Sequence, residues 1–247
     1  MNYARALAST YDALYAGLRD GSGDREHYAA LAAERGGPIV ELGCGTGRVL
    51  LPIARAGLPC VGVDPSTAML DVLRAKDPPP NLDLVVGAME TLDLPRRDFA
   101  LAFAAFRAFQ HLLTVDAQLE ALARINDHLA EGGWLALDVF EPNLARMATD
   151  EPETAEAPFE FDGRRITRTF AVRRDRATQT MDLTLRYLDT ESGDELGREV
   201  LGLRWIYRYE LEHLLWRAGF TPIRWSSGYD GRPYDGSGDI VVVARRR

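Results

Sequence analysis

Residues 40–48 read Val-Glu-Leu-Gly-Cys-Gly-Thr-Gly-Arg, with a glycine at every second position from 43 to 47. An apolar run, residues 38–40, leads into this stretch, and a helical pattern follows from about Arg48 to Ala56. A strand, a glycine-rich turn and a helix in this order are typical of a turn that cradles a nucleotide. The glycines allow a sharp bend and a close approach to a ligand because they carry no Cβ. The stretch therefore predicts a ligand site rather than a plain connecting turn.

The spacing of the glycines argues against two other nucleotide-binding turns. A dinucleotide turn, G-x-G-x-x-G, needs a glycine at position 48, where this chain has arginine. A P-loop ends in Gly-Lys-Ser/Thr, which is absent here. The pattern that remains, E-x-G-x-G-x-G from Glu41 to Gly47, resembles motif I of the class I S-adenosylmethionine (SAM)-dependent methyltransferases.

A carboxylate follows at the spacing expected for ribose recognition. Residues 60–64 form a short apolar run that ends in Asp64, 23 positions after Glu41. In nucleotide-binding βαβ units, an acidic residue about 20 positions on binds the ribose hydroxyls. Asp64 has an alternative role as the cap of a helix that starts near Pro65-Ser66. The two roles are compatible, because a residue at a strand end faces the ligand crevice.

Three further segments continue the resemblance in the family's order. Residues 82–86 followed by 87–90 resemble the third strand and its adenine-binding turn. Residues 99–103 followed by 106–112 resemble the fourth strand and the loop where the methyl acceptor meets the cofactor. Residues 131–139 resemble the glycine turn and apolar run of the fifth strand.

The resemblance implies SAM as cofactor, with S-adenosylhomocysteine as its product. It places a lid residue, the glycine loop, the second-strand carboxylate and the two later turns around that cofactor. The cofactor-binding residues expected on this basis are Tyr11, Glu41, Gly43, Cys44, Gly45, Asp64, Pro65, Met69, Ala88, Met89, Glu90, Ala105 and Phe106.

The chain divides into three parts by its residue pattern. Residues 1–36 predict an N-terminal helical lid, broken at 21–23, with Tyr3, Leu7, Tyr11, Leu14, Tyr15 and Leu18 at spacings of three and four. Residues 37–141 and 206–247 predict the SAM-binding α/β core, a Rossmann-like sheet of seven strands. Residues 142–205 predict a connector and an inserted antiparallel sheet after strand five.

The inserted part begins near the sheet edge where ligands bind in open α/β folds. The acidic range 141–157, rich in Pro and Ala, predicts a mobile connector, and residues 165–205 predict an antiparallel meander. Alternating large residues of this insert are candidates for a pocket wall, although some must form its core. These residues are Phe161, Phe170, Leu185, Tyr187 and Trp205.

Within the family, the chain is most similar to small-molecule enzymes that include nucleotide-sugar N,N-dimethyltransferases. Tyr3 and Tyr11-Asp12 resemble the aromatic lid of that group, and residues 106–112 resemble its histidine-bearing acceptor loop. The meander followed by residues 207–220 resembles its C-terminal half. Residues 107–110 are larger than in that group, which leaves the sugar substrate in doubt.

The acceptor side carries the candidate catalytic residues. Methyl transfer from SAM needs orientation and a deprotonated acceptor, and a histidine is suited to supply both near neutral pH. His111, as base or acceptor-orienting residue, and Tyr3 are the candidate catalytic residues, and the acceptor atom is N or O. The candidate substrate-binding residues are Arg107, Gln110 and Arg204, the two arginines as anchors for an anionic group.

Composition narrows the partners. The chain of 247 residues is 46% hydrophobic and 27% charged, with a net charge of −8. An acidic balance argues against nucleic-acid contact, and no apolar run reaches the length of a membrane span. Two cysteines without metal-ligand spacing predict no metal site and no disulfide framework. We expect a cytoplasmic enzyme with a small-molecule acceptor and a possible homodimer.

Two other classes of protein remain open at this point. One is a SAM-fold binding protein without catalysis, against which the candidate base in the acceptor loop argues. The other is an NAD-binding oxidoreductase, against which Arg48 and the C-terminal strands argue.

Overall fold

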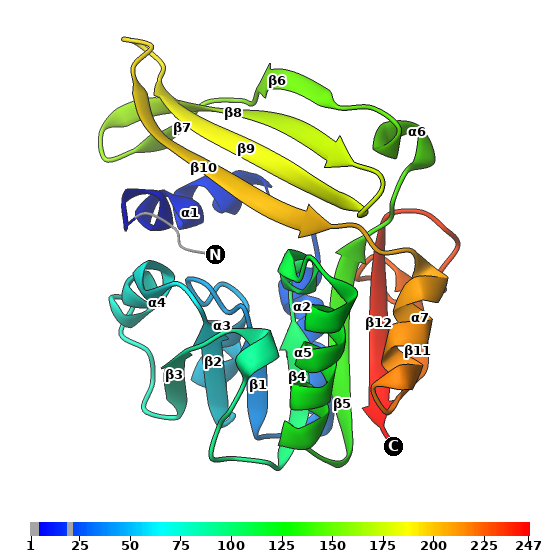
Figure 1. Cartoon of the computed structure of the whole chain (residues 1–247). Coiled ribbons are helices and arrows are strands. Elements are labelled where there is room, and N and C mark those ends of the chain that lie inside the picture. The colour runs from blue at the N-terminus through cyan, green and yellow to red at the C-terminus, as the bar shows by residue number, and fades with distance from the viewer. Residues whose placement is uncertain (1–4, 19–21) are drawn as a thin grey trace.

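A seven-stranded sheet forms the centre of the molecule, which a computed structural model describes over residues 5–18 and 22–247 (Figure 1). The strand order is β11-β12-β5-β4-β1-β2-β3. The five strands from β3 to β5 run parallel, and β12 is antiparallel to both of its neighbours. The strands are β1 (Ile39–Leu42), β2 (Cys60–Asp64), β3 (Leu82–Val86), β4 (Phe99–Ala104), β5 (Leu129–Phe140), β11 (Phe220–Ser227) and β12 (Asp239–Arg246). The predicted α/β fold class is thereby confirmed.

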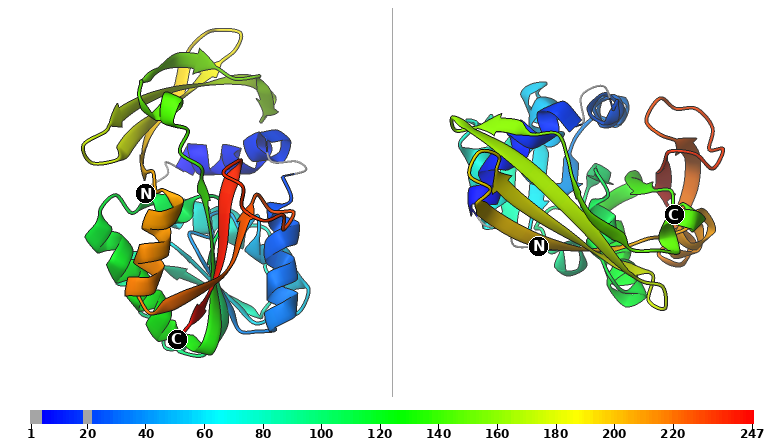
Figure 2. Two further views of the ribbon diagram at one scale, coloured as in Figure 1. Left: turned by 90° about the vertical axis from the view of Figure 1, so that its right-hand side faces the viewer. Right: turned by 90° about the horizontal axis from the view of Figure 1, so that it is seen from above.

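Helices cover both faces of this sheet because its strands are apolar on both sides. On β4, Leu101 and Phe103 join the core on one face, and Ala102 and Ala104 join the core on the other. The first face carries α2 (Asp24–Arg35), α3 (Leu50–Arg55) and α4 (Thr67–Arg74). The second carries α5 (Val115–His128), α7 (Arg208–Arg217) and the short turn η1 (Met89–Thr91). Figure 2 shows α2 and the pair α5 and α7 on opposite sides.

The predicted antiparallel insertion after strand five is present and is larger than expected. It contains β6 (Glu151–Ala155), β7 (Phe159–Phe161), β8 (Arg164–Asp175), β9 (Thr180–Asp189) and β10 (Glu195–Arg204). The order is β10-β9-β8-β6, with β7 also paired to β8. The insert lies over the carboxyl ends of the parallel strands, and α1 (Arg5–Leu18) lies between the two layers (Figure 1).

The prediction of a mobile connector over residues 141–157 is wrong for most of that range. It holds a short helix, α6 (Leu144–Met147), and strand β6, which pairs with β8. Arg174 of β8 anchors the segment, because its guanidinium bonds Thr149 O at 2.5 Å and also pairs with Glu151. Composition alone missed this strand because polar contacts, rather than an apolar face, hold it.

A separate hydrophobic cluster joins the insert to α1. Leu14 of α1 packs with Ile166, Leu185, Tyr187 and Leu201, all of which are buried. One part of the inner face of the insert therefore packs against α1, and another part is left to cover the space below. Within the described residues, none of the helices is long and apolar enough to cross a membrane.

This cluster predicts the effect of a cavity in the insert. Leu185 is 3% exposed and Leu196, in the same sheet, is 39% exposed. Leu185→Ala should lower the free energy of unfolding by about 2–5 kcal/mol because it empties a packed site. Leu196→Ala should change it by less than about 0.5 kcal/mol. Urea unfolding followed by circular dichroism measures both, and equal losses would contradict the assigned core.

Candidate active site

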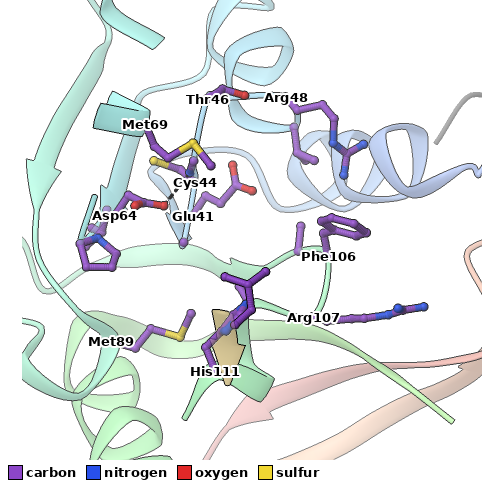
Figure 3. A pocket seen from close by; sticks show the side chains of 18 of the residues that line it. Glu41, Cys44, Thr46, Arg48, Asp64, Met69, Met89, Phe106, Arg107 and His111 are labelled. Carbon is purple, nitrogen blue, oxygen red and sulfur yellow. Dashed lines mark hydrogen bonds between the residues drawn. The ribbon is translucent and has the colours of Figure 1, made fainter. Parts of the chain in front are cut away.

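A cavity of about 430 Å³ lies between the carboxyl ends of the parallel strands, α1 and the insert. Most of the residues predicted for the site contribute to its wall. These are Tyr11, Glu41, Gly43, Cys44, Gly45, Asp64, Pro65, Met69, Ala88, Met89, Glu90, Ala105, Phe106, Arg107 and His111. Figure 3 shows Met69 and Asp64 at one side of the cavity and His111 at another. Tyr3 lies outside the described residues.

The glycine loop follows β1 and bends so that it borders the cavity. Gly43 has a φ of 75°, and a Cβ there would come within 2.8 Å of the Ala108 Cβ. Gly45 has a φ of 54°, and a Cβ there would meet no atom within 4 Å. Gly43 thus permits close packing, whereas Gly45 leaves open space beside a backbone that a ligand can approach.

Asp64 holds the glycine loop rather than capping the next helix. Its Oδ2 accepts a hydrogen bond from Gly45 N at 2.8 Å, and its Oδ1 accepts one from Ser66 N at 2.8 Å. The helix cap is the Ser66 hydroxyl, which accepts from Met69 N. Burial raises the pKa of Asp64, and the two backbone bonds oppose that shift. A carboxylate oxygen has more than one lone pair, so Asp64 retains acceptor capacity toward the cavity.

Glu41 offers a buried acceptor that the described residues leave unused. The side chain is 3% exposed, and no described donor reaches its Oε2. Burial raises the pKa of Glu41 well above its usual range, and the nearby Arg48 charge opposes this rise. An unpaired buried carboxylate oxygen is costly, so the site suits a ligand that brings a hydrogen-bond donor or a cation.

A set of aromatic contacts joins α1 to the turn that follows β4. The ring of Tyr15 lies 4.4 Å from that of Tyr11 and meets Phe106 edge-on at 5.2 Å. Arg168 of β8 extends over Tyr15 and donates from Nη1 to the Tyr15 hydroxyl at 3.2 Å. Its remaining donors bind both carboxylate oxygens of Glu156, at 2.5 and 2.9 Å.

Sequence reasoning missed Tyr15 and Arg168 as wall residues. The signal for Tyr15 was its position four residues after Tyr11, which puts both rings on one helix face. Arg168 lies in a strand whose pattern gave no sign of proximity to the cavity.

His111 lines the cavity, and one of its ring nitrogens contacts the insert. It ends the short turn η2 (Ala108–His111), and its Nδ1 lies 2.9 Å from Gly202 O of β10. A carbonyl only accepts, so Nδ1 carries the hydrogen and Nε2 keeps a lone pair. Burial lowers the pKa of His111 to about 4. The imidazole is therefore neutral at physiological pH.

The side chains of two predicted substrate-binding residues bond other groups of the protein instead of lining the cavity. Gln110 is fully buried, where it donates to Arg204 O at 3.1 Å and accepts from Phe140 N at 3.0 Å. The Arg204 guanidinium bonds Thr178 O at 3.0 Å and Glu210 at 2.9 Å. Neither residue belongs to the cavity wall. Each side chain instead forms hydrogen bonds or an ion pair where the insert joins the core.

Arg107 borders the cavity but is held by a carboxylate of its own chain. Its guanidinium bonds Asp239 Oδ1 at 2.9 Å and lies 5.5 Å from the Phe140 ring. In Figure 3 the side chain extends away from His111. The charge is therefore largely balanced before a ligand binds.

The insert contributes a different set of residues to the wall than the predicted one. Leu183, Leu201 and Leu203 line the cavity, whereas the predicted Phe161, Phe170, Leu185, Tyr187 and Trp205 do not. Leu183 and Leu185 lie on the same face of β9, but only the end near Leu183 covers the cavity. The alternation identified the correct face, and the position along the strand decided which residues reach the site.

The burial of His111 gives a direct prediction. In the folded protein its ring should titrate near pH 4, because burial penalises the charged form. In the unfolded chain it should titrate near about 6.5. The unfolded state therefore binds more protons between these values, and this residue lowers folding stability as the pH falls through that interval. NMR of the ring Cε1–H in native protein and in urea measures both values, and a native midpoint above 6 would contradict a desolvated neutral imidazole.

Comparison with known proteins places this site in a family. Residues 39–133 match the model of a methyltransferase domain. The chain is 25% identical over 246 residues to a cypemycin N-terminal methyltransferase from Streptomyces sp., covering 99% of this chain and 98% of that one.

Two solved structures are similar over most of their length. The CcbJ methyltransferase from Streptomyces caelestis is 28% identical with a TM-score of 0.78, covering 91% of this chain and 90% of its own. CalS10, an amino pentose methyltransferase from Micromonospora echinaspora solved with SAM bound, is 26% identical with a TM-score of 0.72, covering 96% and 97%. With the glycine loop, Asp64 and Glu41 bordering one cavity, these matches show that the chain is a class I SAM-dependent methyltransferase similar to the small-molecule enzymes of that family.

Proposed function

We propose that this enzyme methylates an amine nitrogen of a small molecule bound between η2 and the insert. The observation that carries the proposal is His111, a half-buried neutral imidazole whose Nδ1 bonds Gly202 O and whose Nε2 keeps a lone pair. The alternative within the same family is transfer to a hydroxyl oxygen. A hydroxyl acceptor requires this histidine to act as a base, whereas an amine acceptor requires only that it orient the nitrogen.

The chain's own residues fit the cofactor in the half of the cavity next to the glycine loop. Asp64 has acceptor capacity for the ribose hydroxyls, and the unpaired Glu41 Oε2 suits the amino group of the methionine part. Met69 and Met89 offer polarisable side chains for the adenine ring. When bound, SAM supplies a methyl group already activated by its sulfonium, for in-line transfer to a lone pair.

An amine acceptor suits the weak basicity of His111. A neutral amine has its own lone pair and becomes an ammonium ion after methyl transfer, so the chemical step needs no base. A hydroxyl must lose its proton to become a good nucleophile, and a base with a pKa of about 4 has little driving force for this. The Nε2 lone pair can still accept an N–H hydrogen bond and so orient the amine.

The surroundings of His111 favour an amine in its neutral form. Leu183, Leu201 and Leu203 make an apolar roof over this part of the cavity. An apolar wall disfavours the charged ammonium form and so keeps the nitrogen lone pair available. Tyr11 and Tyr15 of the lid helix add to the enclosure and limit the access of water.

The chemistry of the relatives supports the same choice of atom. By their names, one related protein methylates the N-terminus of cypemycin and another methylates an amino pentose. A peptide amine and an amino sugar differ in size and shape, and the amino group is what they share. We therefore infer from these relatives that the acceptor atom is an amine nitrogen, and experiment must identify the rest of the acceptor.

Asp64→Ala should weaken SAM binding by roughly 1.5–3 kcal/mol, the scale of hydrogen bonds to a charged group. The change removes the ribose acceptor and the anchor of Gly45 N together. Asp71→Ala is the matched control, because Asp71 is exposed and pairs with Arg74 within the same helix, α4. Calorimetric titration with SAM measures both variants. An unchanged affinity in Asp64→Ala would exclude the ribose assignment.

The acceptor atom is tested with pairs of small molecules that differ only in carrying an amino or a hydroxyl group. Formation of S-adenosylhomocysteine, with mass spectrometry of the product, should detect methylation of the amines. His111→Ala should lower turnover by ~10²-fold with nearly unchanged SAM affinity, because it removes acceptor orientation. His213→Ala, an exposed histidine of α7, is the control. Methylation confined to the hydroxyl members would refute the amine proposal.

A further inference from the structure

One buried carboxylate beneath the acceptor loop has no part in the chemistry described so far. Asp138 lies near the carboxyl end of β5 and is fully buried. Its Oδ1 accepts from Tyr28 Oη at 2.6 Å and from Phe106 N at 2.8 Å, and its Oδ2 accepts from Arg107 N at 2.8 Å. Burying a carboxylate is costly unless hydrogen bonds compensate for its desolvation. The bonds from Tyr28, Phe106 and Arg107 supply this compensation for Asp138.

The two backbone partners form an unusual turn. Phe106 has a φ of 54° and Arg107 a φ of 64°, so two successive residues with side chains adopt the left-handed conformation. Such residues persist where the surrounding structure over-determines them, and they cluster at functional sites. Both amides of this turn point at the same carboxylate, which supplies that constraint.

The turn connects the two halves of the cavity. On the lid side, the Phe106 ring contacts Tyr15 at 5.2 Å and lies 5.6 Å from the Arg48 guanidinium. On the acceptor side, η2 starts directly after Arg107 and ends at His111. A shift of the turn would therefore move the aromatic wall and the histidine together.

The third partner anchors the carboxylate to another layer of the protein. Tyr28 of α2 is fully buried and stacks on Phe103 of β4, with the ring centroids 4.7 Å apart. Its hydroxyl meets the Asp138 oxygen that also binds Phe106 N. The turn is thus held against rigid elements on one face of the central sheet.

We propose that Asp138 is a positioning residue for methyl transfer, which fixes the Phe106-Arg107 turn and thereby the placement of His111 against the acceptor. It acts through its bonds to Phe106 N and Arg107 N and does not itself touch the acceptor. The activity arm of the test below rests on the proposed amine acceptor, and the spectroscopic arm does not.

The test compares Asp138→Asn with wild type in the complex with S-adenosylhomocysteine. An asparagine has nearly the same shape, but its amide nitrogen cannot accept a hydrogen bond, so one backbone amide loses its partner. The amide resonances of Phe106 and Arg107 and the ring resonance of His111 should shift in NMR spectra. Turnover of an amine found in the screen above should fall by about 10²-fold, because small misplacements at a reacting centre are costly. Affinity for S-adenosylhomocysteine should fall by much less than turnover.

Two further variants separate positioning from a loss of stability. Tyr28→Phe removes one bond of Asp138 and keeps both backbone bonds, so turnover should fall by roughly fivefold, the factor for one lost hydrogen bond. His128→Gln is the matched control, because His128 is buried and hydrogen-bonded to Leu94 N and Arg124 O, outside the cavity wall. It should lower the melting temperature without moving the resonances of the turn or the turnover.

The outcomes are distinguishable. Unchanged resonances of Phe106 and Arg107 in Asp138→Asn would overturn the proposal, and so would shifted resonances with wild-type turnover. If the wild type itself methylates no amine, the proposed function fails, and the His111 ring resonance in Asp138→Asn then decides the positioning role. If Asp138→Asn does not fold, Tyr28→Phe decides, and an unchanged Phe106 amide with wild-type turnover in that variant would refute it.

Discussion

The parallel pairing of β1 with β2 and β4 is the constraint on which the rest of the structure depends. It brings the carboxyl ends of three strands to one edge, so Glu41, the glycine loop and Asp64 become neighbours. The bond from Gly45 N to Asp64 Oδ2 then joins the first turn to the second strand. Both faces of the sheet are buried under helices, so this edge is where polar side chains gather.

The insert covers this open edge, and most of the side chains that it contributes to the cavity wall are apolar. Its inner face packs on α1 at one end, around Leu14 and Leu185, and covers the cavity with leucines at the other. The edge strand β10 also receives the His111 Nδ1 hydrogen through Gly202 O, which sets the tautomer of the imidazole. The same sheet therefore supplies the apolar environment and the orientation of the histidine within it.

Charged groups near the acceptor side are mostly balanced within the protein. Arg168 is bound by Glu156, and Arg107 is bound by Asp239. Arg204, an expected anchor for an anionic substrate, instead pairs with Glu210 where β10 leads into α7. Binding an anionic acceptor at these arginines would compete with existing ion pairs, whereas an amine and an apolar body meet no such competition. This charge balance agrees with the proposed amine acceptor.

The sequence by itself determined the alternating order of strands and helices in the α/β core, because apolar periodicity and glycine spacing are local properties of the chain. It identified Glu41, Gly43, Asp64 and His111 as residues of one site, since motif order in an α/β fold places strand ends together. Only the tertiary structure decided that β6 is a strand, because polar contacts with Arg174 hold it. It also decided that Gln110 bonds Arg204 O and that Arg204 bonds Thr178 O, because these partners are distant in sequence. It also decided the state of His111 and the three bonds of Asp138, because burial and long-range hydrogen bonding depend on which segments meet in space.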